Sequence, residues 1–425
     1  MKHAQFAEDV SVVVAQSIAE LSPFLADLEE LASAAAEPNV FYEPWMLVPA
    51  MRWLARGADL HLSLFFIRGK GSTPRGQLCG FFPLEVLSRY NHFPVKTARL
   101  WRHKFCYLCT PLLRQGRERE TLAAFFEWSA SHSTNWRLVE FGLNSGAGVL
   151  HELLVDSTAS NQRVNLVDVR FTRPFLQRAL TADTYLRTTV SPKHRKDIGK
   201  KERKLRQLGK VEYATPIVAE EAGEWIDEFV ELEASGWKGR GGATISADPA
   251  HRSFFREAMN AAWRAGRLDL IGLRLNSKLI ALKINLLCRG GSFAFMITFD
   301  ERYAAYSPGL LLEVENIRRL HKDSDVEWMD SCADQHSPMF NRIWSEKRVI
   351  ETLLVSNDSW VGDAWIGLIP LGHWLRRTFL GFASGRNTAV ANAVRRPEAS
   401  PREVISLRYA ADTAEVCVQD GSSEK

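Results

Sequence analysis

Residues 299–312 read Phe299-Asp300-Glu301-Arg302-Tyr303-Ala304-Ala305-Tyr306-Ser307-Pro308-Gly309-Leu310-Leu311-Leu312, and they join a strand-like apolar run to a helix-like run. Ser307 is a favourable N-cap residue, because its hydroxyl can accept a hydrogen bond from an amide in the first helical turn. Pro308 suits the first helical position, where no amide donor is needed. Gly309 leaves room for a ligand near the backbone. The free amides at this helix start therefore form a candidate phosphate seat.

Two familiar phosphate-binding motifs are absent from this stretch. It contains neither the Gly-x-x-x-x-Gly-Lys-Ser/Thr loop nor the Gly-x-Gly-x-x-Gly fingerprint. An ordinary capped helix after a strand therefore stays open as the alternative interpretation of residues 299–312.

Three further segments accompany this turn in a fixed order over roughly residues 40 to 350. They are Phe41-Tyr42-Glu43-Pro44-Trp45-Met46, Ser191-Pro192-Lys193-His194-Arg195-Lys196 and Trp237-Lys238-Gly239-Arg240. Together with Asp300, Tyr303 and the Tyr306-to-Gly309 turn, they resemble motifs of the Fem-like branch of the GNAT N-acyltransferases, which includes CelD-like proteins. The order and spacing of the segments carry the resemblance more than any single motif does.

The resemblance implies an α/β (α+β) fold of tandem GNAT-like units, each a mixed twisted sheet flanked by helices. Strand-like and helix-like runs follow a similar order in the two halves of the chain, which agrees with two related units. We expect an N-terminal unit at 1–178, a C-terminal acyltransferase unit at 179–357, and an amphipathic helix with a disordered tail at 358–425. The spacing of apolar residues also predicts a helix over Val10 to Ala35.

The resemblance also implies an acyl-CoA donor, acetyl-CoA in the simplest case, whose pyrophosphate binds at the loop before a helix. Ser307, Gly309 and Leu310 occupy that loop here. Acyl transfer to an amine requires a group that accepts the proton of the amine. The candidates are Asp300 at the end of a strand, Asp330 in the strand expected beside it, and His336 in the following loop. For each of these, a capping or structural role is the alternative.

The segment Trp237-Lys238-Gly239-Arg240-Gly241-Gly242 combines aromatic and basic side chains with glycine hinges. This composition suits a lid over a substrate, and it equally suits an exposed glycine-rich turn. We therefore assign Trp237, Lys238 and Arg240 to the acceptor, together with Tyr303 and Tyr306, which otherwise are half-buried turn aromatics.

A basic run follows the Ser191-Pro192 motif and continues to Lys210. Ile198, Leu205 and Leu208 fall on one helical stripe, so the opposite face should be strongly cationic. A solvated helix, a nucleic-acid surface and a seat for an anionic donor all agree with this pattern. Lys193 and Arg195 are the residues that we assign to the donor.

Composition sets further bounds. The chain has 425 residues, a net charge of +4 and six cysteines, which does not suggest a disulfide scaffold. Cys106 and Cys109 form a Cys-x-x-Cys pair, but Cys79, His92 and His103 lack zinc-ligand spacing, so buried thiols and no metal are expected. No secretory or membrane-spanning segment is apparent, and a cytoplasmic location follows.

We therefore expect an acyl-CoA-dependent N-acyltransferase whose acceptor is an amine of a small molecule or of a polysaccharide or cell-envelope precursor. A Fem-type enzyme that uses aminoacyl-tRNA, and a non-catalytic GNAT-like scaffold of a polysaccharide-synthesis system, are the alternatives. Residues 365–380 are apolar with Arg376 and Arg377. They suit a helix packed on the protein or one in peripheral contact with a membrane.

Overall fold

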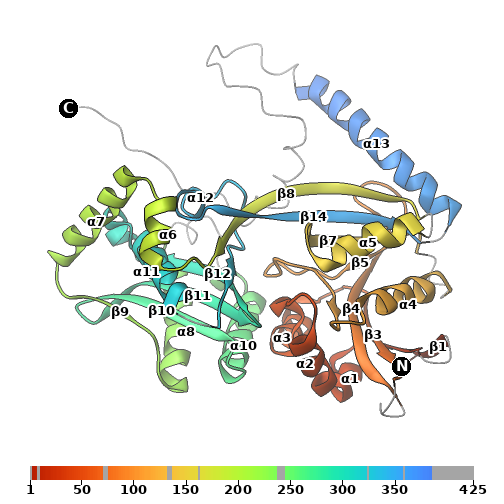
Figure 1. Ribbon diagram of the computed structural model, residues 1–425, viewed down its shortest axis with the longest axis horizontal. Helices are drawn as coiled ribbons and strands as arrows, with labels where there is room; N and C mark the ends of the chain where they lie inside the picture. Colours follow the sequence, from red (N-terminus) through yellow and green to blue (C-terminus); the bar gives the residue numbers. More distant parts are fainter. Residues whose placement is uncertain are drawn as a thin grey trace.

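The computed structural model describes residues 2–6, 10–69, 75–131, 136–160, 163–236, 245–322, 325–357 and 359–384. Two α/β halves stand side by side, and strands of both halves belong to one continuous sheet (Figure 1). The strand order in this sheet is β1-β2-β3-β4-β5-β7-β14-β8-β13-β12-β11-β10-β9, with β6 paired to β4.

The N-terminal half holds the strands β1 (Lys2–Phe6), β2 (Val10–Ala15), β3 (Leu60–Ile67), β4 (Gln77–Leu87), β5 (Thr97–Leu100), β6 (Leu112–Leu113), β7 (Leu138–Ser145) and β8 (Asn165–Gln177). Its helices are α1 (Ile18–Leu21), η1 (Ser22–Phe24), α2 (Leu25–Ala34), η2 (Val40–Tyr42), α3 (Pro44–Leu54), α4 (Glu118–Ser131) and α5 (Val149–Ser160).

The helix predicted over Val10 to Ala35 is wrong at its start. Residues Val10–Ala15 form β2, which pairs with β3 in antiparallel register. Three successive valines favour a strand, because β-branched side chains fit a pleated surface better than a helix. The helical part of the segment begins only at Ile18, where Ser17 accepts a hydrogen bond from the amide of Glu20.

The C-terminal half holds the strands β9 (Val211–Ala214), β10 (Leu268–Leu275), β11 (Lys278–Cys288), β12 (Gly291–Phe299), β13 (Trp328–Asp330) and β14 (Glu346–Ser356). Its helices are α6 (Ala182–Thr189), α7 (Pro192–Arg206), α8 (Ala219–Ser235), η3 (Ile245–Ala247), α10 (Pro249–Arg264), η4 (Glu301–Tyr306), α11 (Pro308–Lys322), α12 (Phe340–Ile343) and α13 (Trp360–Ser384).

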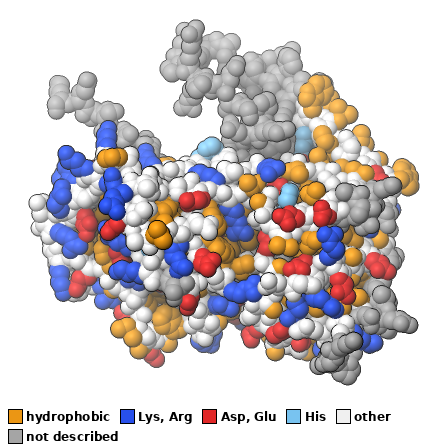
Figure 2. Space-filling model, viewed as in Figure 1, with side chains coloured by type: hydrophobic (Ala, Val, Ile, Leu, Met, Phe, Trp, Pro, Cys, Tyr) orange, Lys and Arg blue, Asp and Glu red, His pale blue; other side chains and the backbone are white. Residues whose placement is uncertain are grey.

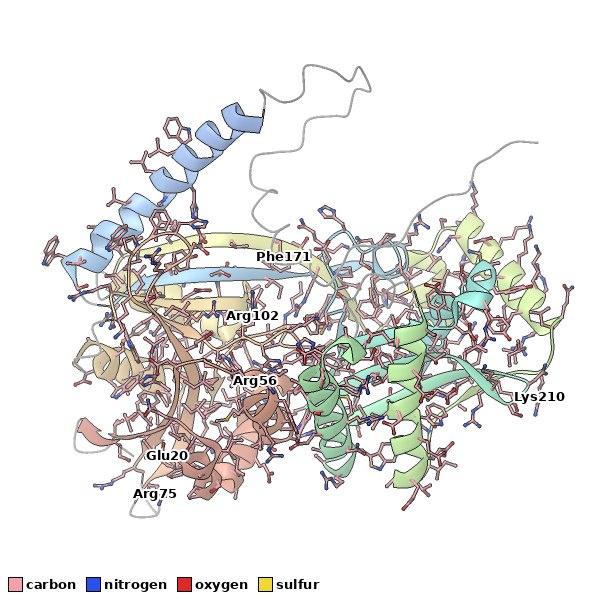
Figure 3. All side chains as sticks on the ribbon, turned by 180° about the vertical axis from the view of Figure 1, so that it is seen from behind. Glu20, Arg56, Arg75, Arg102, Phe171 and Lys210 are labelled. Atoms are coloured by element: carbon pink, nitrogen blue, oxygen red, sulfur yellow. The ribbon has the colours of Figure 1, made fainter. Side chains whose placement is uncertain are left out.

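The two long strands β8 and β14 join the halves. β14 follows β13 in the sequence, yet it lies between β7 and β8 and pairs with both. β8 pairs with β14 along its length and with β13 through Phe175, Leu176 and Gln177. Phe171 marks the part of β8 that spans the two halves in Figure 3. Each half therefore contributes one strand to the sheet of the other.

Helices cover both faces of the C-terminal sheet. α8 and α10 pack on one face, where α10 also contacts α3 of the N-terminal half. α11, α6 and α7 pack on the other face around a separate cluster that includes Leu311, Leu312 and Ile317. The predicted mixed α/β fold of two similar units is confirmed, with the additional feature that their sheets are continuous.

Candidate functional site

The candidate site begins where β12 and β13 diverge. These parallel strands pair only at Gly291, Ser292 and Phe293 of β12. Beyond Phe293, β12 continues to Phe299 paired with β11 on its other side, whereas β13 ends at Asp330. Two parallel strands that separate in this way open the sheet between them, and the edge of β12 that faces β13 is available to a ligand.

The N-terminus of α11 lies at the open end of this gap. Ser307 has φ +50° and ψ 55°, the left-handed region, and its carbonyl accepts from the amide of Leu311 at 3.1 Å. Its hydroxyl accepts a hydrogen bond from Lys201 Nζ at 3.0 Å, and none of the described amides donates to it, so the expected amide cap is not formed. Lys201 comes from α7 and also pairs with Asp197 at 3.2 Å.

This corner has the chemistry of an anion seat. Within the described part of the chain, the amides of Gly309 and Leu310 have no protein acceptor, as expected for a first helical turn. Pro308 and Gly309 are buried, whereas Ser307 and Leu310 are half-buried. A Cβ at Gly309 would lie 3.4 Å from Phe299, an ordinary contact, so packing alone does not require glycine there. Lys201 and the helix dipole both favour a negatively charged group.

Asp300 is held by its own turn. Its carboxylate accepts from the amide of Arg302 at 3.1 Å and from the Arg302 guanidinium at 2.9 Å. The hydrogen bonds from Arg302 lower the pKa of Asp300 below its ordinary value. A carboxylate with a lowered pKa is a weak proton acceptor, and this geometry favours a capping function at η4.

Asp330 lies at the centre of a buried ion cluster. Arg173 Nη2 on β8 donates to its Oδ2 at 2.7 Å, and Arg348 Nη1 on β14 donates to the same oxygen at 2.9 Å. Burial alone would raise the pKa of Asp330, but Arg173 and Arg348 hold it below the ordinary value. Since β8 and β14 bridge the halves, this cluster fixes β13 to both strands.

The remaining predicted residues around the turn lie closer to solvent. His336 is exposed, and its amide donates to Asp334 Oδ1 at 2.7 Å. Tyr303 and Tyr306 are half-buried and pack against the α11-side core cluster. Trp237, Lys238 and Arg240 lie outside the described residues.

α7 presents a cationic face toward solvent. Lysine and arginine side chains gather over this helix at the left of Figure 2. Lys193 is exposed and Arg195 is half-buried, so they lie on different sides of the helix. Seen from behind, Lys210 continues the basic run at the end of the C-terminal half that lies away from the N-terminal half (Figure 3). The exposed basic residues of α7 are Lys193, Lys196, Lys200, Arg203, Lys204 and Arg206.

The N-terminal half closes the other side of the gap. Tyr107 stacks edge-on against Phe295 of β12, with ring centroids 5.9 Å apart. Burial raises the pKa of its hydroxyl, which also interacts electrostatically with Cys332 and Glu233. Glu233, on α8, is buried and accepts from the amide of Ile245 at 2.9 Å. This amide lies just beyond the segment that carries Trp237.

These contacts were missed at the sequence level. Lys201 belonged to the noted basic run, but nothing in the run distinguishes it from its neighbours. Tyr107 is separated from β12 by more than 180 residues, and only the fold brings them together. Lys283 and Glu313 form a fully buried pair at 2.7 Å between β11 and α11, which no local pattern indicates.

Metal and thiol chemistry receive little support. Among the described residues, no group of three or more His, Cys, Asp or Glu side chains could hold a metal ion. Cys106 and Cys109 are buried free thiols with sulfur atoms 3.7 Å apart, in irregular backbone.

Comparison with known proteins agrees with this geometry. Residues 192–336 match the family model described as an acetyltransferase (GNAT) domain. The matched range includes α7, the β12–β13 divergence and the N-terminus of α11. No curated protein sequence matches the chain.

One solved structure extends the similarity beyond this domain. The crystal structure of FemX aligns with 78% of this chain and 95% of its own, at 8% identity and a TM-score of 0.51. A conserved protein of unknown function from Bacteroides thetaiotaomicron aligns with 81% of this chain and 99% of its own, at 10% identity and a TM-score of 0.49. At such identities the similarity concerns the fold.

Proposed function

We propose that this chain is an N-acyltransferase, because residues 192–336 match the acetyltransferase (GNAT) domain model and the fold resembles that of FemX. Its donor is acyl-CoA, acetyl-CoA in the simplest case, and its acceptor is an amine. The observation that carries the proposal is the divergence of β12 and β13 with the N-terminus of α11 at the open end. The thioester lies in the gap, and the donor pyrophosphate binds the amides of Gly309 and Leu310 beside Ser307.

Lys201 supports this donor site with a positive charge. Its ammonium lies 3.0 Å from Ser307 Oγ, at the first turn of α11. A pyrophosphate there gains a charge-assisted hydrogen bond in addition to the helix amides. We also assign Arg195 and Lys193, near the start of α7, to the phosphates of the donor.

The reaction needs one proton acceptor and one proton donor. The amine nitrogen attacks the thioester carbon, the amine loses a proton, and the carbon–sulfur bond breaks as the thiolate takes a proton. Of the assigned bases, Asp300 and Asp330 have lowered pKa values, whereas His336 has no guanidinium partner among the described residues. We assign His336 as base, with Asp300 and Asp330 as positioning residues.

Tyr107 is the proton donor in this scheme. We assign it this role because its ring packs against Phe295 of β12, beside the gap between β12 and β13. A Tyr107→Phe enzyme keeps the ring contacts, so its kcat should fall by about 100-fold with little change in KM. An unchanged kcat would remove Tyr107 from the scheme.

The acceptor approaches from the α8 side, where Tyr107 and Glu233 lie. We also assign Trp237, Lys238 and Arg240, which follow α8 in the sequence, to the acceptor. Tyr303 and Tyr306 contribute from the turn. An amine on a polysaccharide or cell-envelope precursor, acted on in the cytoplasm, suits this role by analogy with the fold.

Aminoacyl-tRNA is the second candidate donor, because the exposed basic face of α7 could neutralise RNA phosphates. Thermal melting separates the candidates. We expect acyl-CoA of a suitable chain length to raise the melting temperature, and Gly309→Leu to abolish that rise. Stabilisation by tRNA alone, weakened by salt, would support the second donor. A protein that responds to neither would be a non-catalytic scaffold.

A further inference from the structure

The last described helix, α13, packs against the N-terminal half through one face only. Ile366 and Ile369 are 3% and 0% exposed and pack with Leu138 of β7 and Leu354 of β14. His373 Nδ1 lies 3.4 Å from Asp168 Oδ1 on β8. From this attachment the helix rises above β8 and β14 at the upper right of Figure 1.

The opposite face of α13 is apolar and uncovered. Leu368, Leu371 and Leu375 follow one another at intervals of three and four residues, which places them on one stripe. Figure 2 shows hydrophobic side chains gathered along this helix at the upper right. The exposed apolar residues are Trp360 (80%), Leu368 (48%), Leu371 (50%), Trp374 (60%) and Leu375 (39%).

The charge pattern and the tryptophans of α13 suit a lipid surface better than nonspecific hydrophobic association. Residues 364–375 contain no Asp, Glu, Lys or Arg, and the sequence then continues with Arg376 and Arg377. Among residues 360–375, Trp360 and Trp374 are the most exposed apolar side chains. Tryptophan favours the boundary between lipid head groups and acyl chains, and two arginines that directly follow an apolar segment in the sequence favour anionic head groups.

We propose that α13 binds the surface of an anionic phospholipid membrane, lying in the plane of the interface. No helix among the described residues is long and apolar enough to cross a bilayer, so α13 would lie on the membrane rather than span it. The face held by Ile366 and Ile369 stays on the protein, and the leucine–tryptophan stripe enters the lipid. This inference goes beyond the acyl transfer proposed above and does not depend on it.

Vesicle sedimentation with the full chain tests the proposal. We expect binding to vesicles of phosphatidylcholine and phosphatidylglycerol, weaker binding to phosphatidylcholine alone, and loss of the difference at high salt. The double variant L371E/W374E should bind anionic vesicles at least about tenfold more weakly, because it puts two carboxylates on the stripe.

The matched control is Leu180→Glu, which places the same charge on a residue that is 94% exposed and far from α13 in sequence. This variant should bind vesicles like the unchanged protein. The single variant Trp374→Glu provides a second reading if the double variant does not fold.

Three results would overturn the proposal. They are the absence of vesicle binding, equal binding by L371E/W374E, and self-association through the stripe without vesicle binding. The last result would identify a second copy of the chain as the occupant. Since the assay contains neither acyl donor nor acceptor, its outcome is independent of the catalytic proposal.

Discussion

Lys201 connects two elements at the proposed donor site, because its ammonium reaches from α7 to Ser307 at the start of α11. Lys201→Ala removes a charge-assisted hydrogen bond, which contributes about 1.5–3 kcal/mol. We expect KM for acyl-CoA to rise about tenfold or more, with kcat nearly unchanged. Steady-state kinetics measures both values.

Lys200→Ala is the control for this change, since Lys200 is exposed on the outer face of the same helix. It removes an equal charge without contacting Ser307. If both variants raised KM equally, the effect would come from the overall charge of α7 rather than from the contact between Lys201 and Ser307.

Replacing the buried carboxylate of Asp330 should lower the stability of the protein. Its carboxylate is fully buried between Arg173 and Arg348. Asp330→Asn leaves both guanidinium groups without their counter-charge, so the free energy of unfolding should fall by about 3–5 kcal/mol. Urea denaturation measures this loss. Asp227→Asn, in an exposed pair with Arg256, should cost no more than about 1 kcal/mol.

The same carboxylate gives a pH dependence with a definite sign. The pKa of Asp330 is lower in the folded protein than the value of about 3.9 expected when unfolded. Its contribution to stability is therefore present above about pH 4 and is lost as the pH falls through the folded pKa. Asp330→Asn should lack this part of the acid dependence.

At the scale of elements, the loop after β5 and the helix α10 meet at His103. Its ring lies 5.3 Å from that of Phe254, and burial lowers its pKa to about 3. In the unfolded chain the His103 imidazole takes up a proton near pH 6.5, whereas in the folded protein it stays neutral down to about pH 3. Stability should therefore fall by up to about 1.4 kcal/mol per pH unit below pH 6.5.

His103→Phe isolates this effect, because it keeps an aromatic ring between the elements and removes the titration. Unfolding free energies at pH 7 and pH 5 should differ by about 2 kcal/mol more in the unchanged protein than in the variant. Equal differences would mean that His103 takes up its proton in the folded state.

Elements with strong local signals were predictable from sequence. The β10–β11 hairpin follows from Asn276 and Ser277, whose φ values of +49° and +71° suit a tight turn. Pro308 correctly indicated the start of α11. Val10–Ala15 was misread because apolar residues in a short run fit either period.

The contacts that build the candidate site were not predictable in this way. Lys201 meets Ser307, and Tyr107 meets Phe295, across large separations in sequence. The position of β14 between β7 and β8 likewise depends on pairing with the other half of the chain. The domain boundaries at 178 and 357 stay a prediction, since strands on both sides of the first boundary share one sheet.

At the scale of the whole molecule, β14 ties the stabilities of the halves together. Ile350 on β14 is fully buried, so Ile350→Ala should cost about 2–5 kcal/mol. We expect β3 and β11, one in each half, to lose hydrogen-exchange protection in a single step in this variant. Loss of protection in only one half would show that the continuous sheet does not couple them.

Hydrogen exchange at Gly309 and Leu310 with and without acetyl-CoA tests the central claim most directly. The account predicts slower exchange of these two amides when the donor is bound, and loss of that protection in Lys201→Ala. Saturating acetyl-CoA and longer acyl-CoA donors that leave both amides unchanged would contradict a donor site at the N-terminus of α11.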